Sequence, residues 1–392
     1  MWKSVASNAL TLFVVILIAL AALVAWGRNE FVKPGPLAQP ICVQVERGAS
    51  LSGVSRNLQE RGAISDARIF RIGAEYTDLA DDLKFGSYMV PAGASMEAVL
   101  QAITVGGRST CGRDLNFRIG VTRADVILSE LDLTTNNYVE VARFDAGVET
   151  LPTEYTEVAD DPALVFRVTV AEGVTSWQIV DALKKADFLQ GSLETVPPEG
   201  TLAPGGYEPA RGSERGALIA EMSARQARVL ADAWEKRAPD LPYDTPEEAL
   251  IMASIIEKET SIPEERGRVA SVFVNRLRQG MRLQTDPTVI YGITKGESVL
   301  GRGLRQSELR RETPWNTYVI SGLPPTPIAN PGAESIRAAL NPDDTDFIFF
   351  VADGTGGHAF ARTLDEHNRN VARWRQIEAE RGAEGTTGVQ GE

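Results

Sequence analysis

Two glutamates, Glu257 and Glu259, stand directly behind an uncharged run in the stretch "ALIMASIIEKETS". Residues two apart on a helix point about 200° apart, because one turn takes ~3.6 residues. An intact helix therefore presents only one of these carboxyl groups to a given site. Glu257 would share a face with Leu250 and Ala253, and apolar surroundings favour the protonated form that a general acid needs. The alternative is a glutamate at a helix end, in water or paired with an arginine, and the spacing by itself favours that alternative.

Other residues that could do chemistry have simpler structural roles. Asp286 precedes Pro287, and the pair marks a turn that the carboxyl group would close. His358 lies in a Gly-Gly turn, where a lone histidine is more often a structural donor than a base. Large aromatic side chains can stack on sugar rings or fill a core. Those in this half of the chain include Tyr291, Trp315 and Tyr318.

The composition argues against several classes of protein. The chain has 392 residues, so two or three domains are expected. Its net charge of −13 does not suit a surface that binds nucleic acid or anionic lipid. It has two histidines, and neither a CxxC nor an HExxH pattern occurs, which makes a zinc site improbable. We therefore expect no metal and no cofactor.

The first 27 residues set the expected compartment. No charge occurs from Ser4 to Gly27, and this length matches the ~20 residues that cross a bilayer. A cleaved signal peptide is the alternative, but the apolar run exceeds the usual signal core of about 7–15 residues, which favours an uncleaved anchor. The flanking charges orient the run only weakly. Two cysteines, Cys42 and Cys111, suit an oxidising compartment, so we expect the bulk of the chain outside the cytoplasm.

A strand, a turn and a capped helix recur three times in the first half. In "VQVERGASLSG" two valines alternate, Gly48 turns the chain and Ser50 can cap a helix. "YMVPAGASMEAV" repeats the pattern with Ser95 as the cap, and "FRVTVAEGVTSW" repeats it with Gly173 at the turn. The spacing of the three units is irregular, so they indicate small strand–helix modules rather than a solenoid.

From Thr245 the pattern changes to helices joined by loops. Thr245, Pro246 and Glu248 predict a helix start with a cap, an early proline and an early acid. A second helix is expected between Pro263 and Gly280. The stretch "DFIFFVADGTGGHAF" reads as a strand, a glycine turn and a returning strand. This half is therefore predicted to be α+β.

Four stretches together resemble the YceG-like family of endolytic murein transglycosylases: "ASIIEKET", "VFVNRLRQGMRLQTDPTVIYG", "WNTYVISGLPPTPIANPG" and "FVADGTGGHAF". The resemblance covers about residues 165–375, and residues 43–106 look like that family's LysM-like module. It implies an α+β fold with an N-terminal transmembrane helix, a small LysM-like βααβ module and an α+β catalytic domain. The expected boundaries are 1–3 for a cytoplasmic tip, 4–27 for the transmembrane anchor, 28–40 for a linker, 41–108 for the LysM-like module, 109–160 for an insertion of unknown role, 161–380 for the catalytic domain and 381–392 for a disordered tail.

The resemblance also assigns chemistry. In that family the first glutamate of the "EKET" run is the catalytic acid/base, which corresponds to Glu257 and outweighs the helix-end alternative. Such an enzyme can use one carboxyl group, which protonates the glycosidic oxygen and then takes the proton of the sugar's 6-hydroxyl as a 1,6-anhydro ring closes. Glu259 is expected to leave the helix on another face and to meet Arg, Lys or water. Groups that the resemblance implies for glycan binding are Gln284, Thr285, Asp286, Tyr291, Asn316 and Tyr318.

The implied substrate is nascent peptidoglycan, cut between N-acetylmuramic acid and N-acetylglucosamine. The implied location is the bacterial inner membrane, with one span and a periplasmic catalytic domain. Expected partners are the glycan strands and the glycan-polymerising synthases, and no nucleic acid.

Two departures from the family pattern occur. The stretch "APGGYEP" at 203–209 keeps Tyr207, but Gly205 and Gly206 replace the polar pair that the family usually carries. Residues 109–160 also form a longer segment than the family suggests.

Cys42 and Cys111 bracket the LysM-like module, and we predict that a disulfide ties its two ends together. The alternative is two unpaired buried thiols.

Two other functions stay open. A lysozyme-like hydrolase would use Asp286 as the second carboxylate that ordinary glycosidases need. A catalytically silent scaffold would bind glycan through the LysM-like module.

Overall fold

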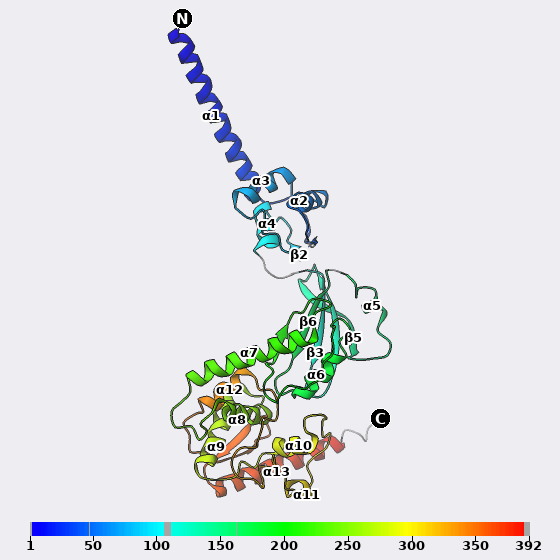
Figure 1. Ribbon diagram of the computed structural model, residues 1–392, viewed down its shortest axis with the longest axis vertical. Helices are drawn as coiled ribbons and strands as arrows, with labels where there is room; N and C mark the ends of the chain where they lie inside the picture. Colours follow the sequence, from blue (N-terminus) through cyan, green and yellow to red (C-terminus); the bar gives the residue numbers. More distant parts are fainter. Residues whose placement is uncertain (1, 47, 106–110, 162, 388–392) are drawn as a thin grey trace. The chain divides into compact units, whose positions relative to one another are not determined.

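The computed structural model describes residues 2–46, 48–105, 111–161 and 163–387 (Figure 1). The chain forms two compact units. The first comprises Met1–Leu115, Ile127–Arg143 and Thr150–Val165, and the second comprises Asn116–Val126, Phe144–Glu149 and Phe166–Glu392.

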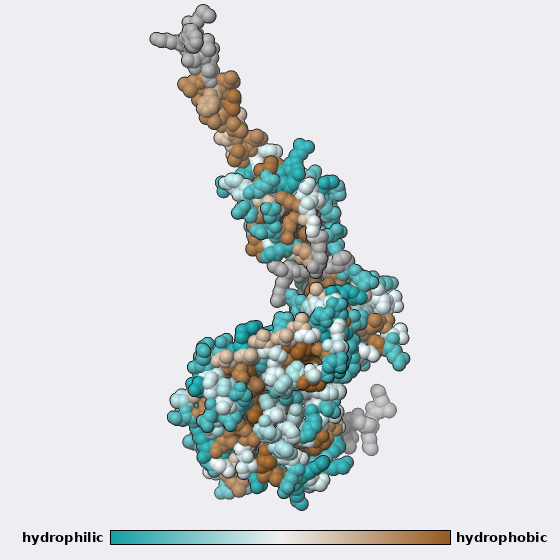
Figure 2. Space-filling model, in the orientation of Figure 1, coloured by the Kyte–Doolittle hydropathy of each residue, from teal (hydrophilic) through white to brown (hydrophobic). Residues whose placement is uncertain are grey.

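A long helix, α1 (Trp2–Val32), opens the chain. Its segment Leu10–Val32 is long and apolar enough to cross a membrane, and none of its most apolar window is buried inside the molecule. Figure 2 shows this bare apolar surface in brown. A signal sequence near the N-terminus has the same length and composition, so the helix is a candidate span. It begins before the predicted anchor, 4–27, and ends after it.

The described part of the chain after α1 has the predicted βααβ order. Its elements are β1 (Ile41–Val45), α2 (Leu51–Glu60), α3 (Ala67–Tyr76) and β2 (Gly86–Val90), followed by α4 (Met96–Thr104). β1 and β2 pair antiparallel, with Val43 opposite Tyr88. The hydroxyls of Ser50 and Ser95 accept backbone N–H groups from the first turns of α2 and α4, which confirms the predicted caps. Fully buried side chains from both strands and all three helices close the core, among them Val43, Leu58, Phe70, Tyr88 and Ile103.

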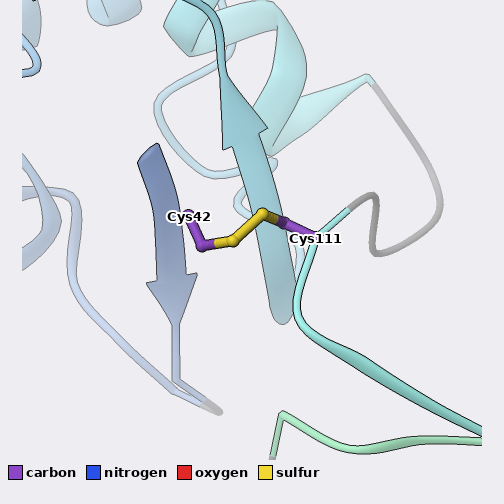
Figure 3. Close-up of a disulfide and its surroundings, with 2 residues drawn as sticks. All are labelled: Cys42 and Cys111. Atoms are coloured by element: carbon purple, nitrogen blue, oxygen red, sulfur yellow. A yellow bond between two sulfur atoms is a disulfide. The ribbon is translucent and has the colours of Figure 1, made fainter. Parts of the chain in front are cut away.

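Cys42, on β1, forms a disulfide with Cys111 (Figure 3). The two Cα atoms are 5.6 Å apart, and the residues are 69 positions apart in the chain. The N–H of Cys111 also donates to the carbonyl of Ser87 over 3.1 Å, so Cys111 lies against β2. The bond closes a loop that contains the βααβ elements and α4.

A five-stranded sheet has the order β5-β4-β3-β6-β7. Its strands are β3 (Arg113–Ile119), β4 (Ala124–Asp132), β5 (Asn137–Asp145), β6 (Val165–Val170) and β7 (Gly205–Tyr207). The segment predicted as an insertion, 109–160, supplies the first three of these strands and the short helix α5 (Thr153–Thr156). Its role as an insertion stays a prediction. β6 leads into α6 (Ser176–Lys184) through a turn at Gly173, which confirms the third strand–turn–helix unit.

The second unit is built around α8 (Pro246–Glu259). Thr245 and Glu248 form a capping box and Pro246 lies in the first turn, as predicted. Every residue from Ala249 to Ile256 is buried, because α8 packs against α7, α9, α10 and α12. The helices of this unit besides α6 and α8 are α7 (Arg215–Glu235), the 3-10 turn η1 (Pro263–Glu265), α9 (Arg266–Arg278), α10 (Asp286–Thr294), α11 (Gln306–Leu309), α12 (Ala333–Leu340) and α13 (Leu364–Thr387).

Three predictions concern the last third of the chain. β8 (Phe349–Ala352) and β9 (His358–Ala361) form the predicted antiparallel hairpin. The predicted turn at Asp286 and Pro287 is wrong, since both residues belong to the first turn of α10. Proline suits that position because its missing N–H would have no helical partner there. α13 extends to Thr387, into the predicted disordered tail 381–392, of which 388–392 lie outside the described residues.

Candidate active site

Glu257 follows the buried run of α8 and meets the start of α12. Its Oε2 accepts a hydrogen bond from the backbone N–H of Gly332 over 2.9 Å. Gly332 is the N-cap of α12, so the carboxyl group lies where a helix dipole favours negative charge. Glu257 is half-buried, whereas Ile256 before it is fully buried. The carboxyl group thus stands at the edge of an apolar core.

A second carboxyl group, that of Glu172, lies against the same glycine. A Cβ at Gly332 would overlap the Glu172 carboxyl group, yet φ at Gly332 is −72°, which any residue adopts. The backbone would therefore accept a side chain at this position, but that side chain would have to push the Glu172 carboxyl group aside. Burial raises the pKa of Glu172, and the negative charge of Glu257 raises it further. Arg266, whose Nη2 lies 3.4 Å from Glu172 Oε2, acts in the opposite direction.

The turn between β6 and α6 carries Glu172 to this position. Gly173 has φ +77°, a left-handed conformation that favours glycine. Lys258, from α8, donates from Nζ to the carbonyl of Gly173 over 3.2 Å. Burial lowers the pKa of Lys258, while the negative charges of Glu257 and Glu199 raise it. Lys258 thus ties the turn to α8 and adds a positive charge beside Glu257.

The fully buried side chain of Asn330 holds the loop before α12 in place. Its Nδ2 donates to the carbonyl of Val174 over 3.0 Å and to Ser176 Oγ over 3.2 Å. Its Oδ1 accepts from the N–H of Leu202 over 2.9 Å. The backbone of Asn330 makes further hydrogen bonds to the turn between β6 and α6. The loop that delivers one partner of Glu257 is therefore fixed to the turn that carries the second carboxyl group.

Tyr291, a predicted glycan contact, joins this network through Glu199. Tyr291 donates from its hydroxyl to Glu199 Oε2 over 3.3 Å, and Glu199 Oε1 accepts from the N–H of Ser176 over 2.7 Å. Burial raises the pKa of Glu199, and the hydrogen bond from Ser176 opposes that rise. Burial also raises the pKa of Tyr291, with the charge of Glu199 adding to it. The ring of Tyr291 lies 5.8 Å from that of Trp315.

Glu259 faces different residues. The hydroxyl of Thr285 donates to its Oε1. Burial raises the pKa of Glu259, and the hydrogen bond from Thr285 opposes that rise. Glu259 was expected to meet Arg, Lys or water; its hydrogen-bond partner is instead a neutral hydroxyl from the loop before α10, and Arg276 acts on it through its charge.

A cavity of about 260 Å³ lies beside Glu259. Its other lining residues include Thr260, His358, Trp374 and Arg381. A buried carboxyl group with a raised pKa beside a cavity is a candidate acid in its own right. Glu259 is thus the direct rival of Glu257 for that role.

Asp286 and Tyr318 lie together on the Glu259 side of α8. The hydroxyl of Tyr318 donates to Asp286 Oδ1 over 2.7 Å. Burial raises the pKa of Tyr318, and the hydrogen bond to Asp286 raises it further. The negative charge of Asp286 also raises the pKa of Glu259. The predicted glycan contacts therefore divide into two groups: Tyr291 near Glu199 and Lys258, and Thr285, Asp286 and Tyr318 near Glu259.

The two remaining predicted contacts differ in their exposure. Gln284 is exposed and has φ +53°. Asn316 has no exposed surface, and its Nδ2 donates to three backbone carbonyls over 2.7–3.2 Å. Its Oδ1 accepts from the N–H of Tyr318. The polar atoms of Asn316 therefore serve the loop that contains it, and its glycan contact stays a prediction. Thr285 is 3% exposed and gives its hydroxyl to Glu259.

His358 has the structural role that its place in a turn indicated. Its Nδ1 lies 2.8 Å from Oε2 of the buried Glu265, and its backbone N–H donates to Oε1 of the same residue over 3.0 Å. Within the described residues, no group of three or more His, Cys, Asp or Glu side chains is arranged to hold a metal ion.

The glycine pair at 205–206 has a packing explanation at its first position. Tyr207 is buried and donates from its hydroxyl to the carbonyl of Ala203 over 2.7 Å. The guanidinium of Arg225 lies over the Tyr207 ring, 5.5 Å from its centre. A Cβ at Gly205 would lie 3.2 Å from that guanidinium, and φ there is +124°. The glycine therefore leaves room for the arginine.

The sequence did not single out Glu172, Glu199, Lys258 or Asn330. Glu172, Lys258 and Asn330 belong to stretches that were quoted for another reason, such as "FRVTVAEGVTSW" and "WNTYVISGLPPTPIANPG", whereas Glu199 lies in none of them. The available signal was a charged or amide residue beside a glycine turn, and it does not say which distant residue is the partner.

Comparisons with known proteins support one family. A model of the YceG-like family matches residues 43–373. The endolytic murein transglycosylase of Bacillus subtilis (strain 168) is 28% identical over 337 residues, which cover 83% of this chain and 82% of that protein. The endolytic murein transglycosylase of Streptococcus pneumoniae serotype 2 is 25% identical over 345 residues, or 85% of this chain and 58% of that protein. A putative yceG-like protein of Listeria monocytogenes has a crystal structure with 26% identity and a TM-score of 0.43, covering 85% of this chain and 99% of that one.

Proposed function

The chain belongs to the YceG-like family, and on this premise we propose that it is an endolytic murein transglycosylase. Its substrate would be the glycan strand of peptidoglycan, cut between N-acetylmuramic acid and N-acetylglucosamine to leave a 1,6-anhydro end. The observation that supports this best is the carboxyl group of Glu257, at the edge of the apolar core and held by the N–H of Gly332, inside the part of the chain that matches the family.

In the proposed reaction Glu257 acts first as an acid. Its proton goes to the glycosidic oxygen, and the bond from that oxygen to the sugar C1 breaks with the electron pair moving to the oxygen. Glu257, now a carboxylate, then accepts the proton of the 6-hydroxyl as that oxygen bonds to C1. No water is consumed, because the substrate supplies its own nucleophile. The hydrogen bond from Gly332 keeps the carboxyl group in one orientation through both steps.

The predicted glycan contacts on the Glu259 side suit a strand that runs past the end of α8. Asp286 and Tyr318 offer a carboxylate and a hydroxyl at a partly exposed surface, and Gln284 is exposed beside them. Tyr291 and Trp315 offer aromatic faces near Glu199. We assign sugar contacts to Gln284, Asp286, Tyr291 and Tyr318, and none to Thr285 or Asn316, whose side chains are buried.

A second glycan site is proposed on the βααβ module, which we interpret as LysM-like. A cavity of about 660 Å³ is lined by the segment between β1 and α2, by α3 and by the segment before β2. Its polar lining includes Glu46, Ser50, Arg71, Glu75 and Asp81. Hydroxyl-rich sugars would find many hydrogen-bond partners there.

The helix α1 is proposed to anchor the enzyme at the outer face of the inner membrane, where it would meet newly made strands and their synthases. The apolar segment Leu10–Val32 supports this, and the disulfide suits an oxidising compartment. Fractionation of the expressed full chain tests the anchor. The proposal expects the protein in the membrane pellet after an alkaline wash, whereas a soluble form that begins near Trp26 would identify a cleaved signal.

The hydrolase that would use Asp286 as the second carboxylate is less well supported. Asp286 accepts a hydrogen bond from Tyr318, and its charge raises the pKa of Glu259. The carboxyl group that meets Gly332 and raises the pKa of Glu172 is that of Glu257. A glycan-binding scaffold without activity would lack turnover altogether. Incubation of the protein with purified glycan strands, followed by mass spectrometry, separates the three functions. Anhydro ends support the transglycosylase, ends that have gained water support the hydrolase, and intact strands support the scaffold.

A further inference from the structure

Two carboxyl groups from distant parts of the chain meet at Gly332. Glu257 comes from the end of α8 and accepts the N–H of Gly332 over 2.9 Å. Glu172 comes from the turn after β6, and its carboxyl group fills the space that a side chain at Gly332 would need. Gly173, next to Glu172, also lies against Glu257: a Cβ there would be 3.6 Å from Glu257 Cγ. Both carboxyl groups therefore lie beside Gly332, and the backbone next to Glu172 also lies against Glu257.

Charged groups from three helices face Glu172. From α8 the facing groups are Glu257 and Lys258, from α9 the buried Arg266, and from α12 Glu334. Arg266 is 9% exposed and its Nη2 is 3.4 Å from Glu172 Oε2. Glu334 is itself paired with Arg337, so three positive charges accompany the three carboxyl groups and balance them.

We propose that Glu172 is a positioning residue for proton transfer, whose negative charge beside Gly332 opposes loss of the proton that Glu257 carries. This inference rests on the proposed acid role of Glu257. Before the cut the pair holds one proton, and Glu257 delivers it to the glycosidic oxygen while Glu172 remains the charged member. The proton that leaves the 6-hydroxyl as its oxygen bonds to C1 returns to Glu257. Each turnover therefore starts and ends with the same proton count.

The pair differs from two independent acids in its response to pH. While Glu172 is charged, loss of the proton from Glu257 would place two negative charges side by side. Their repulsion opposes that loss. Replacement of Glu172 by neutral glutamine removes that opposition. The proton is then lost more readily, so the enzyme loses its acid at a lower pH.

The test is the pH profile of kcat/KM for fragment release from purified glycan strands. In Glu172→Gln we expect the alkaline limb to move to lower pH by about one unit, the lower end of the effect of a neighbouring charge. Glu172→Asp keeps the charge and should move the limb back toward its original position. Glu194→Gln is the matched control, because it removes an exposed carboxylate that is not among the charges acting on Glu172, and its limb should stay in place. Thermal melting confirms that each variant is folded.

An unchanged limb in Glu172→Gln would overturn the inference, as would a rate that falls by the same factor at every pH, since that is the signature of a structural role. The proposed function fails separately. Ends that have gained water would contradict the transglycosylase, yet the limb would still report on Glu172, because hydrolysis also needs the acid. Absence of any release from the wild-type protein would overturn both.

Discussion

The backbone N–H of Gly332 donates to the carboxyl group of Glu257 over 2.9 Å, although 75 positions of chain separate the two residues. The contact exists because α8 and α12 pack together in the core, and Gly332 caps α12 where α8 ends. This contact joins the buried helix α8 to the backbone N–H group that orients the Glu257 carboxyl group.

Gly332→Ala should reduce activity by about 10–100-fold, because the new Cβ overlaps the Glu172 carboxyl group and pushes it from its place beside Glu257. The backbone at Gly332 suits alanine, so the melting temperature should change little. Gly216→Ala, in α7, is the matched control, since a Cβ there meets nothing within 4 Å. Equal activity of both variants in the glycan assay would show that the space at Gly332 is unimportant.

Asn330→Ala should lower the free energy of unfolding by about 3 kcal/mol, because it strands buried hydrogen-bonding groups. The groups that lose a partner include the N–H of Leu202. The exposed Asn137→Ala should change stability by less than about 0.5 kcal/mol. Denaturant unfolding measures both free energies. A loss as small as that of Asn137→Ala would contradict the proposal that Asn330 holds these loops together.

Glu199 should make stability depend on pH. Burial raises its pKa, so the folded protein holds this proton over a range in which the unfolded chain has released it. The folded state then binds more protons, and the free energy of unfolding falls as pH rises through that range, from the ordinary glutamate pKa up to the raised one. Glu199→Gln should flatten the slope, and the exposed Glu194→Gln should leave it intact. A slope that survives in Glu199→Gln would assign it to other groups.

The disulfide between Cys42 and Cys111 should stabilise the βααβ module by about 4 kcal/mol, as expected for closing a loop between residues 69 positions apart. The double variant Cys42→Ser, Cys111→Ser should therefore unfold at lower denaturant concentration. The wild-type protein, exported under oxidising conditions, should also migrate faster on a gel without reductant than with it. Two free thiols by alkylation and mass spectrometry would show that the bond does not form.

Local signals made several elements predictable. Thr245, Pro246 and Glu248 lie within four residues of one another, and together they set the start of α8. Asp286 and Pro287 carry signals for a turn and for a helix start alike, and packing of α10 against α8 favours the helix. Short-range patterns therefore specify an element best when they allow one reading.

Long-range partners were not predictable from the sequence. Glu172 pairs with Arg266, which is 94 positions away in the chain, and no residue near Glu172 in the sequence predicts that pairing. The family resemblance implied that Asn316 binds sugar, but only the folded loop shows that its amide nitrogen already donates to three carbonyls. The anchor, the LysM-like assignment and the catalytic role of Glu257 remain predictions, since they concern membrane, ligand and reaction rather than fold.

The central claim is that Glu257 and not Glu259 supplies the proton, and one comparison tests it most directly. Glu257→Gln and Glu259→Gln keep the shape of each side chain, and glutamine can still accept from Gly332 or Thr285. The measurement is the yield of 1,6-anhydro ends from purified glycan strands, with thermal melting as the check on folding. We expect Glu257→Gln to lose at least ~10²–10⁴-fold, as for removal of a general acid, and Glu259→Gln to remain close to wild type. Comparable anhydro yield from Glu257→Gln, or loss confined to Glu259→Gln, would contradict the assignment.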